Sequence, residues 1–163
     1  MTKYIERILI VNRGEIARRI IRTAHNMGIS TAAIYAEGDA GEPFVQEADQ
    51  AIALGGSSSL ETYLDVDKVL AAASRAGADA IHPGYGFLAE NAAFAKAVTD
   101  AGLIWIGPSP DAISRMGDKL SSKSLMMDAD VPTLPSAELV AGADMAALAS
   151  DIGYPLLVKA SAG

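Results

Sequence analysis

The sequence predicts an α/β fold with a doubly wound, Rossmann-like parallel sheet, followed by the incomplete start of a second domain. Five short apolar segments recur along the first two thirds of the chain, and a helical pattern of apolar residues follows each of the first four. This alternation is typical of a parallel sheet with helices on both faces. We expect the first domain to comprise residues 1–116 and the second to occupy residues 117–163.

The strand-helix-strand unit at the N-terminus carries the clearest pattern. Residues 8–11 read Ile-Leu-Ile-Val, an apolar, β-branched run typical of a central parallel strand. Apolar residues then recur at helical spacing over residues 16–27, and Gly28 is placed to end that helix. Residues 31–35 are the second expected strand.

A dinucleotide site at the first turn is disfavoured. Such a site needs Gly-x-Gly-x-x-Gly after the strand, so that the backbone can approach a pyrophosphate. The turn contains only Gly14, and Glu37, after the second strand, matches a ribose-binding acid by position alone.

The other elements of the first domain have recognisable boundaries. Strands are expected at residues 50–54, 78–81 and 103–106. The Gly/Ser run at residues 55–59 lacks a basic residue, which favours a surface loop over a phosphate site. Helices are expected to start and stop at residue types that favour helix ends, namely Pro43, Asp65, Gly77, Asn91, Gly102, Ser109 and Pro110.

Residues 82–91, His-Pro-Gly-Tyr-Gly-Phe-Leu-Ala-Glu-Asn, follow the fourth expected strand. Open α/β sheets bind ligands at the carboxyl ends of their strands, so this loop is placed to contact one. Its side chains with useful chemistry are His82, Tyr85 and Glu90. The alternative is a strand-to-helix turn that needs glycine for its φ angles and buries the apolar pair after Gly86.

This loop resembles the signature loop of biotin carboxylases, the ATP-dependent components of acyl-CoA and pyruvate carboxylases. Nine of its ten residues fit the pattern, and Ala89 stands where the family usually has Ser. The resemblance implies that Tyr85 and Gly86 lie beside the ureido ring of biotin. It makes His82 a further candidate for the biotin pocket, although a histidine before proline at a strand end also fits a structural role.

The first turn and helix resemble the same family. Ile-x-x-Asn-Arg-Gly-Glu-Ile-Ala-x-Arg over residues 8–18 is similar to the start of biotin carboxylases, and there the helix contributes to a homodimer surface. Arg18, Arg19 and Arg22 are candidates for that surface. A solvated helix face is an equally good reading of these arginines.

The second domain resembles the opening of an ATP-grasp fold. Gly-Asp-Lys ends at Lys119, and a Gly-Tyr-Pro-x-x-x-Lys-Ala segment contains Lys159. The resemblance implies that both lysines contact ATP phosphates, for which an ammonium is a suitable point-charge partner. We expect helices from Asp118 onward and over residues 143–152, and a strand over residues 154–159.

The resemblance covers the whole chain and implies a parent enzyme of which the chain is about the first third. That enzyme uses MgATP and bicarbonate to carboxylate biotin on a carrier protein, and a carboxyltransferase passes the carboxyl group on. The catalytic residues and metal ligands are expected beyond Gly163, so we expect the chain alone to be inactive. Two alternatives are another ATP-grasp ligase, such as carbamoyl-phosphate synthetase, and a non-catalytic assembly module.

Composition narrows the classes of partner and compartment. The chain has 163 residues, no cysteine and a formal net charge of −7. These values disfavour disulfides, thiolate zinc sites, nucleic acid and anionic membranes. No apolar run approaches the ~20 residues of a membrane span, and the charged N-terminus is unlike a secretory signal. We expect a cytoplasmic protein.

Overall fold

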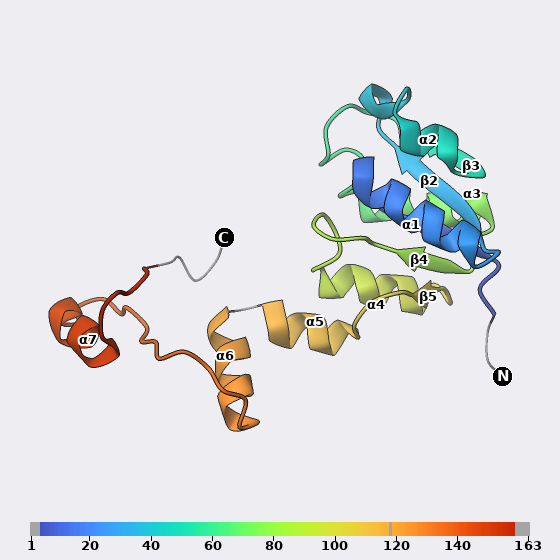
Figure 1. Cartoon of the computed structure of the whole chain (residues 1–163). Coiled ribbons are helices and arrows are strands. Elements are labelled where there is room, and N and C mark those ends of the chain that lie inside the picture. Colours follow the sequence, from blue (N-terminus) through green and yellow to red (C-terminus); the bar gives the residue numbers. More distant parts are fainter. Residues whose placement is uncertain (1–3, 118, 159–163) are drawn as a thin grey trace. The chain divides into compact units, whose positions relative to one another are not determined.

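The computed structural model of the chain describes residues 4–117 and 119–158, without the side chains of residues 119–121 and 124 (Figure 1). The chain divides into two compact units, residues 1–114 and residues 115–163.

The first unit is built on a five-stranded, wholly parallel sheet with the strand order β3-β2-β1-β4-β5. The order places β1 at the centre, with β2 on one side and β4 on the other, so the chain winds outward in both directions from the first strand. The strands are β1 (Arg7–Ile10), β2 (Ser30–Tyr35), β3 (Gln50–Ala53), β4 (Ala80–His82) and β5 (Ile104–Trp105).

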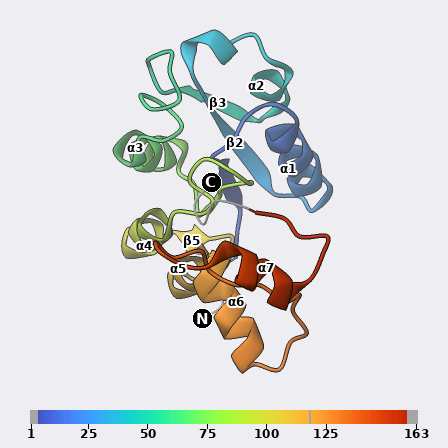
Figure 2. The same ribbon diagram turned by 90° about the vertical axis from the view of Figure 1, so that its left-hand side faces the viewer.

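Helices cover both faces of this sheet (Figure 2). Apolar side chains of α1 and α2 pack on one face, and those of α3 and α4 pack on the other. The predicted doubly wound fold is therefore confirmed. The helical elements of this region are α1 (Gly14–Asn26), the 3-10 helix η1 (Glu37–Asp39), α2 (Pro43–Glu47), α3 (Val66–Ala76), α4 (Ala92–Asp100) and α5 (Pro110–Gly117).

The central strand is apolar because both of its faces are buried. Leu9 and Val11 belong to the core under α3 and α4, whereas Ile8 and Ile10 belong to the core under α1 and α2. All four residues are at most 6% exposed. Burying each such side chain contributes about 1.5–3 kcal/mol, so this strand anchors both cores.

The expected helix boundaries are confirmed by specific contacts. The carboxylate of Asp65 accepts the N–H of Lys68 at 3.0 Å, and the side chain of Asn91 accepts that of Phe94 at 2.9 Å. Gly77 ends α3 in the left-handed region, with a φ of 59°. Each helix of the α3–β4–α4 segment therefore starts and stops where the sequence indicates.

The second unit contains α6 (Lys119–Asp128) and α7 (Met145–Ile152). The expected helix over residues 143–152 is confirmed over Met145–Ile152. It begins at Met145 because the side chain of Asp144 caps it, accepting two backbone N–H groups at 3.0 and 3.1 Å. The expected helix cap at Asp118 lies outside the described residues.

The strand expected at residues 154–159 is wrong over its described part, residues 154–158, which form no strand. Tyr154, Leu157 and Val158 are 67–78% exposed. A strand needs a neighbour for its N–H and C=O groups, and the described part of the second unit contains no strand. Lys159 lies outside the described residues.

We predict that residues 156–158 are far less protected from hydrogen exchange than β1. Their side chains are mostly exposed and their backbone has no ladder partner, whereas Leu9 and Ile10 are fully buried between two paired strands. Amide exchange followed by NMR at high dilution should show rates that differ by orders of magnitude. Equal protection of the two segments would contradict this prediction.

Candidate functional site

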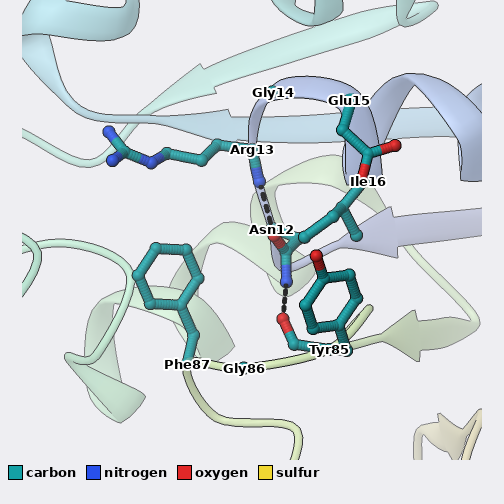
Figure 3. Close-up of a pocket in the computed structure, with 8 residues that line it drawn as sticks. All are labelled: Asn12, Arg13, Gly14, Glu15, Ile16, Tyr85, Gly86 and Phe87. Atoms are coloured by element: carbon teal, nitrogen blue, oxygen red, sulfur yellow. Dashed lines mark hydrogen bonds between the residues drawn. The ribbon is translucent and has the colours of Figure 1, made fainter.

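A hollow opens where the loops after β1 and β4 leave the sheet. These strands are neighbours, but the chain runs from β1 to α1 on one face and from β4 to α4 on the other. Such a reversal is the usual ligand position in an open α/β sheet. The hollow measures about 360 Å³ and is lined by Asn12, Arg13, Gly14, Glu15, Ile16, Tyr85, Gly86 and Phe87 (Figure 3).

Asn12 joins the two loops (Figure 3). Its side chain is 1% exposed, and its Nδ2 donates to the carbonyl oxygens of Pro83 and Tyr85, both at 2.8 Å. Its Oδ1 accepts the backbone N–H of Arg13 at 3.0 Å. One buried amide thus fixes the signature loop, residues 82–91, against the first turn.

Gly84 allows the two loops to approach this closely. It has a φ of 68°, a region that residues with a β-carbon rarely adopt. A β-carbon at this position would lie 2.7 Å from both Asn12 Nδ2 and Ile16 Cγ2. Backbone conformation and space therefore both require glycine here.

Tyr85 and Gly86 form the accessible side of the hollow. Tyr85 is 68% exposed, whereas Pro83 and Leu88 of the same loop are buried, and Figure 3 shows its ring beside Asn12. Gly86 has a φ of 66°, and a β-carbon there would meet nothing within 4 Å. The pair presents an aromatic ring and an open stretch of backbone, which suit a small planar ligand.

His82 has a structural contact instead of a place in the hollow. It is not among the described residues that line the hollow. Its Nδ1 accepts the N–H of Gly84 at 3.0 Å, which requires that nitrogen to be unprotonated. Burial lowers the pKa of His82 below its ordinary value. The neutral ring thus supports the turn that begins the signature loop.

The two lysines expected to contact ATP have no described side-chain contacts. Lys119 is the first residue of α6, and its side chain is not described. Lys159 lies outside the described residues. Their contacts with phosphate stay predictions.

The carboxylates of Glu37 and Glu61 contact the Gly/Ser run, and the ammonium of Lys68 donates to its Gly55 carbonyl at 2.9 Å. Glu37 accepts the N–H of Gly56 at 3.3 Å, and Glu61 accepts both the N–H and the hydroxyl of Ser58. The carboxylate contacts occupy backbone and hydroxyl donors that a phosphate would need. The run is therefore a surface loop. The carboxylate of Glu37 accepts a hydrogen bond from the backbone of this loop and is not left for a ribose hydroxyl.

The described part of the chain offers neither a metal-ion site nor a membrane-spanning helix. No group of three or more His, Asp or Glu residues there could hold a metal ion. No helix there has the length and apolar character needed to cross a bilayer.

The chain matches two protein-family models in succession. Residues 4–113 match the biotin carboxylase N-terminal domain, and residues 118–163 match the carbamoyl-phosphate synthase L chain ATP-binding domain. Because the first match covers more than half of the chain, the chain belongs to the family of the biotin carboxylase N-terminal domain.

Relatives and solved structures agree with this assignment. The chain is 52% identical over 98% of its length to the alpha3 subunit of a biotin-dependent acyl-coenzyme A carboxylase from Mycobacterium leprae, and 48% identical over 97% to a biotin carboxylase from Halalkalibacterium halodurans. It covers 27% and 35% of those two proteins. The chain thus spans about a third of the length of these relatives, in the N-terminal region.

Among solved structures, the biotin carboxylase domain dimer of Hydrogenobacter thermophilus 2-oxoglutarate carboxylase, in complex with MgADP, ADP and bicarbonate, has a TM-score of 0.86 and 44% identity. That similarity covers 99% of this chain and 36% of the solved one. A complete multifunctional pyruvate carboxylase from Rhizobium etli has a TM-score of 0.76 and 40% identity, covering 82% and 14%.

The structure separates the predicted site residues into two groups. Tyr85 and Gly86 line the hollow, and His82 is not among its lining residues. The contact of all three residues with biotin stays a prediction. Asn12 was missed as a site residue, because its partners lie 71 and 73 positions away in the sequence. The available signal was a polar residue directly after an apolar strand.

We predict that Asn12→Ala lowers the free energy of unfolding by about 2–4 kcal/mol, because two carbonyls and one N–H lose their partner. Urea denaturation of the 163-residue chain measures this. Asn26→Ala is the matched control, since Asn26 is the exposed last residue of α1, and its effect should stay within about 0.5 kcal/mol. Similar losses in both variants would show that Asn12 does not join the loops.

We predict an acid-side loss of stability that depends on His82. Its pKa is lowered in the folded state, so below about pH 6.5 the unfolded state binds a proton that the folded state does not. Stability is therefore lost as pH falls below that value. His82→Asn keeps an acceptor for the N–H of Gly84 and cannot titrate. Urea midpoints from pH 8 to pH 5 should fall less in the variant, and parallel curves would contradict the prediction.

Proposed function

We propose that this chain is the N-terminal part of a biotin carboxylase, an ATP-dependent ligase that carboxylates biotin with bicarbonate. The observation that carries the proposal is the hollow between the first turn and the signature loop, with Tyr85 and Gly86 on its open side. When bound, biotin supplies the nitrogen that takes up the carboxyl group. The residues that line the hollow bind and orient it.

The fit to biotin rests on the shape and chemistry of the loop. The ring of Tyr85 offers a flat apolar surface for a bicyclic ligand, and the backbone at Gly86 is open on its side-chain side. Asn12 keeps the carbonyl of Tyr85 directed inward, so the loop backbone is fixed while the ring stays accessible.

We assign ATP binding to the second domain, through Lys119 and Lys159. The match of residues 118–163 to an ATP-binding domain model supports this assignment. We place the domain boundary between residues 116 and 117. The compact units that meet at residues 114 and 115, and the family matches that end at residue 113 and begin at residue 118, support a boundary in this region. Magnesium and bicarbonate would bind with the phosphates.

We propose three macromolecular partners. A biotin carboxyl carrier domain would bring biotin to the hollow, and a carboxyltransferase would use the product; the names of the acyl-coenzyme A carboxylase subunit and the multifunctional pyruvate carboxylase support both. A second copy would pack on the α1 face. There Arg18 pairs with Glu47 of α2 at 2.6 Å, while Arg19 and Arg22 are exposed.

A cysteine-free chain fits a reducing cytoplasm.

The carbamoyl-phosphate synthetase alternative is less well supported. Only the ATP-binding region matches a model from that enzyme, whereas the region with the hollow matches the biotin carboxylase N-terminal domain.

A chimaera tests the proposal. This chain would replace the matching 161-residue segment of biotin carboxylase 1 from Bacillus subtilis, to which it is 46% identical. We expect bicarbonate-dependent ATP cleavage that free biotin stimulates, and none from the 163-residue chain alone. A folded chimaera with no biotin-stimulated turnover would contradict the proposed function.

Lysine substitutions in the same chimaera test the ATP assignment. Lys119→Ala should lower kcat/KM for ATP by about one to two decades. A charge-assisted contact contributes about 1.5–3 kcal/mol, which corresponds to a change of this size. Lys123→Ala is the matched control on the same helix, because the Lys123 ammonium already donates to the carbonyl of Leu134 and the hydroxyl of Ser136. Equal effects of the two substitutions would show that Lys119 is misassigned.

A further inference from the structure

Phe87 adopts an unusual backbone conformation within the signature loop. Its φ is 44°, in the left-handed region, and among the described residues only Asp130 is a second non-glycine residue with positive φ. For a residue with a β-carbon, this region costs roughly 1–2 kcal/mol, so surrounding contacts must hold it there. Phe87 also lines the hollow directly after Gly86.

The contact that holds Phe87 is a stacked pair with Tyr63. The two ring centroids are 5.2 Å apart and the rings are tilted by only 9°. Tyr63 comes from the loop before α3 and is 1% exposed, so it is a fixed support on the core side of the loop.

Tyr63 is held at its hydroxyl by two further segments. The hydroxyl donates to Asp39 Oδ2 at 2.6 Å and accepts the N–H of Ala36 at 3.2 Å. Burial, together with the hydrogen bond to Asp39, raises the pKa of Tyr63, so the hydroxyl stays a donor at all physiological pH values.

The same cluster also fixes Arg13 on the other loop of the hollow. Its Nη1 lies 3.3 Å from Asp39 Oδ1, and its guanidinium carbon lies 5.9 Å from the centre of the Tyr63 ring. Tyr63 therefore contacts a residue from each of the two loops that line the hollow.

We propose that Tyr63 is a positioning residue for the ligand hollow. It holds Phe87 in its left-handed conformation and so fixes Tyr85 and Gly86, the two residues that precede Phe87 in the sequence. Asp39 and the N–H of Ala36 fix Tyr63 in turn. The consequence for biotin rests on the proposed function above. The positioning of the loop does not depend on it, because every contact belongs to this chain.

Amide hydrogen exchange on the 163-residue chain tests the positioning. The N–H of Ala89 donates to the carbonyl of Gly86 at 2.9 Å, so its protection reports on the loop. Tyr63→Leu removes the stacked ring, and Ala89 should exchange about tenfold faster, while Ile21 of α1 should change much less. Tyr63→Phe keeps the ring but frees it from Asp39, and a smaller acceleration, about threefold, is expected.

Tyr35→Phe is the matched control for loss of a tyrosine hydroxyl. Tyr35 ends β2 and packs with the core under α1 and α2, away from Phe87. It should leave Ala89 unchanged. Unchanged Ala89 protection in both Tyr63 variants would overturn the proposal, and so would equal acceleration of Ala89 and Ile21, which would make Tyr63 an ordinary core residue.

The chimaera provides the kinetic readout. Both Tyr63 variants should raise KM for free biotin, by about tenfold for Tyr63→Leu, and leave KM for ATP within about twofold. A rise in both constants, or in neither, would contradict a role at the hollow. If the unsubstituted chimaera has no biotin-stimulated activity, the proposed function fails, and the exchange of Ala89 still decides whether Tyr63 holds the loop.

Discussion

The side-chain amide of Asn12 is the interaction on which the site depends. The last hydrogen bond between β1 and β4 runs from the N–H of Val11 to the carbonyl of His82 at 2.9 Å. After this bond, the segments that follow the two strands turn to opposite faces of the sheet. Backbone groups at such a divergence lose their ladder partners. Asn12 satisfies the carbonyls of Pro83 and Tyr85 and one N–H. It thereby sets the distance between the loops that enclose the hollow.

This arrangement divides the signature loop into supporting and accessible residues. Pro83 and Leu88 are buried, and Gly84 fits against Asn12, so these positions hold the loop in place. Tyr85 and Gly86 are the exposed residues that lie between these supporting positions. The strained backbone at Phe87 lies where the loop returns to the core, and its stacked ring offsets the cost.

Local signals in the sequence were sufficient for most of the fold. Residues such as Asp65, Gly77 and Asn91 act within one helical turn of themselves, so the pattern around them predicts their structure. Asn12 and Tyr63 act through partners more than 20 positions away, and no local pattern indicates those partners. The wrong strand at residues 154–158 has the same cause, because an apolar run indicates a need for burial but not whether a neighbouring strand is present.

A structural turn and the proposed ligand site are compatible with one arrangement of the signature loop. Phe87 and Leu88 pack inward and the glycines take positive φ values, as a turn requires. Tyr85 stays exposed and lies at the edge of the hollow. Precise ligand contacts need a rigid support behind them, and here that support comes from Asn12 on one side and Tyr63 on the other. A loop held at both ends in this way can keep an exposed ring in one position before any ligand arrives.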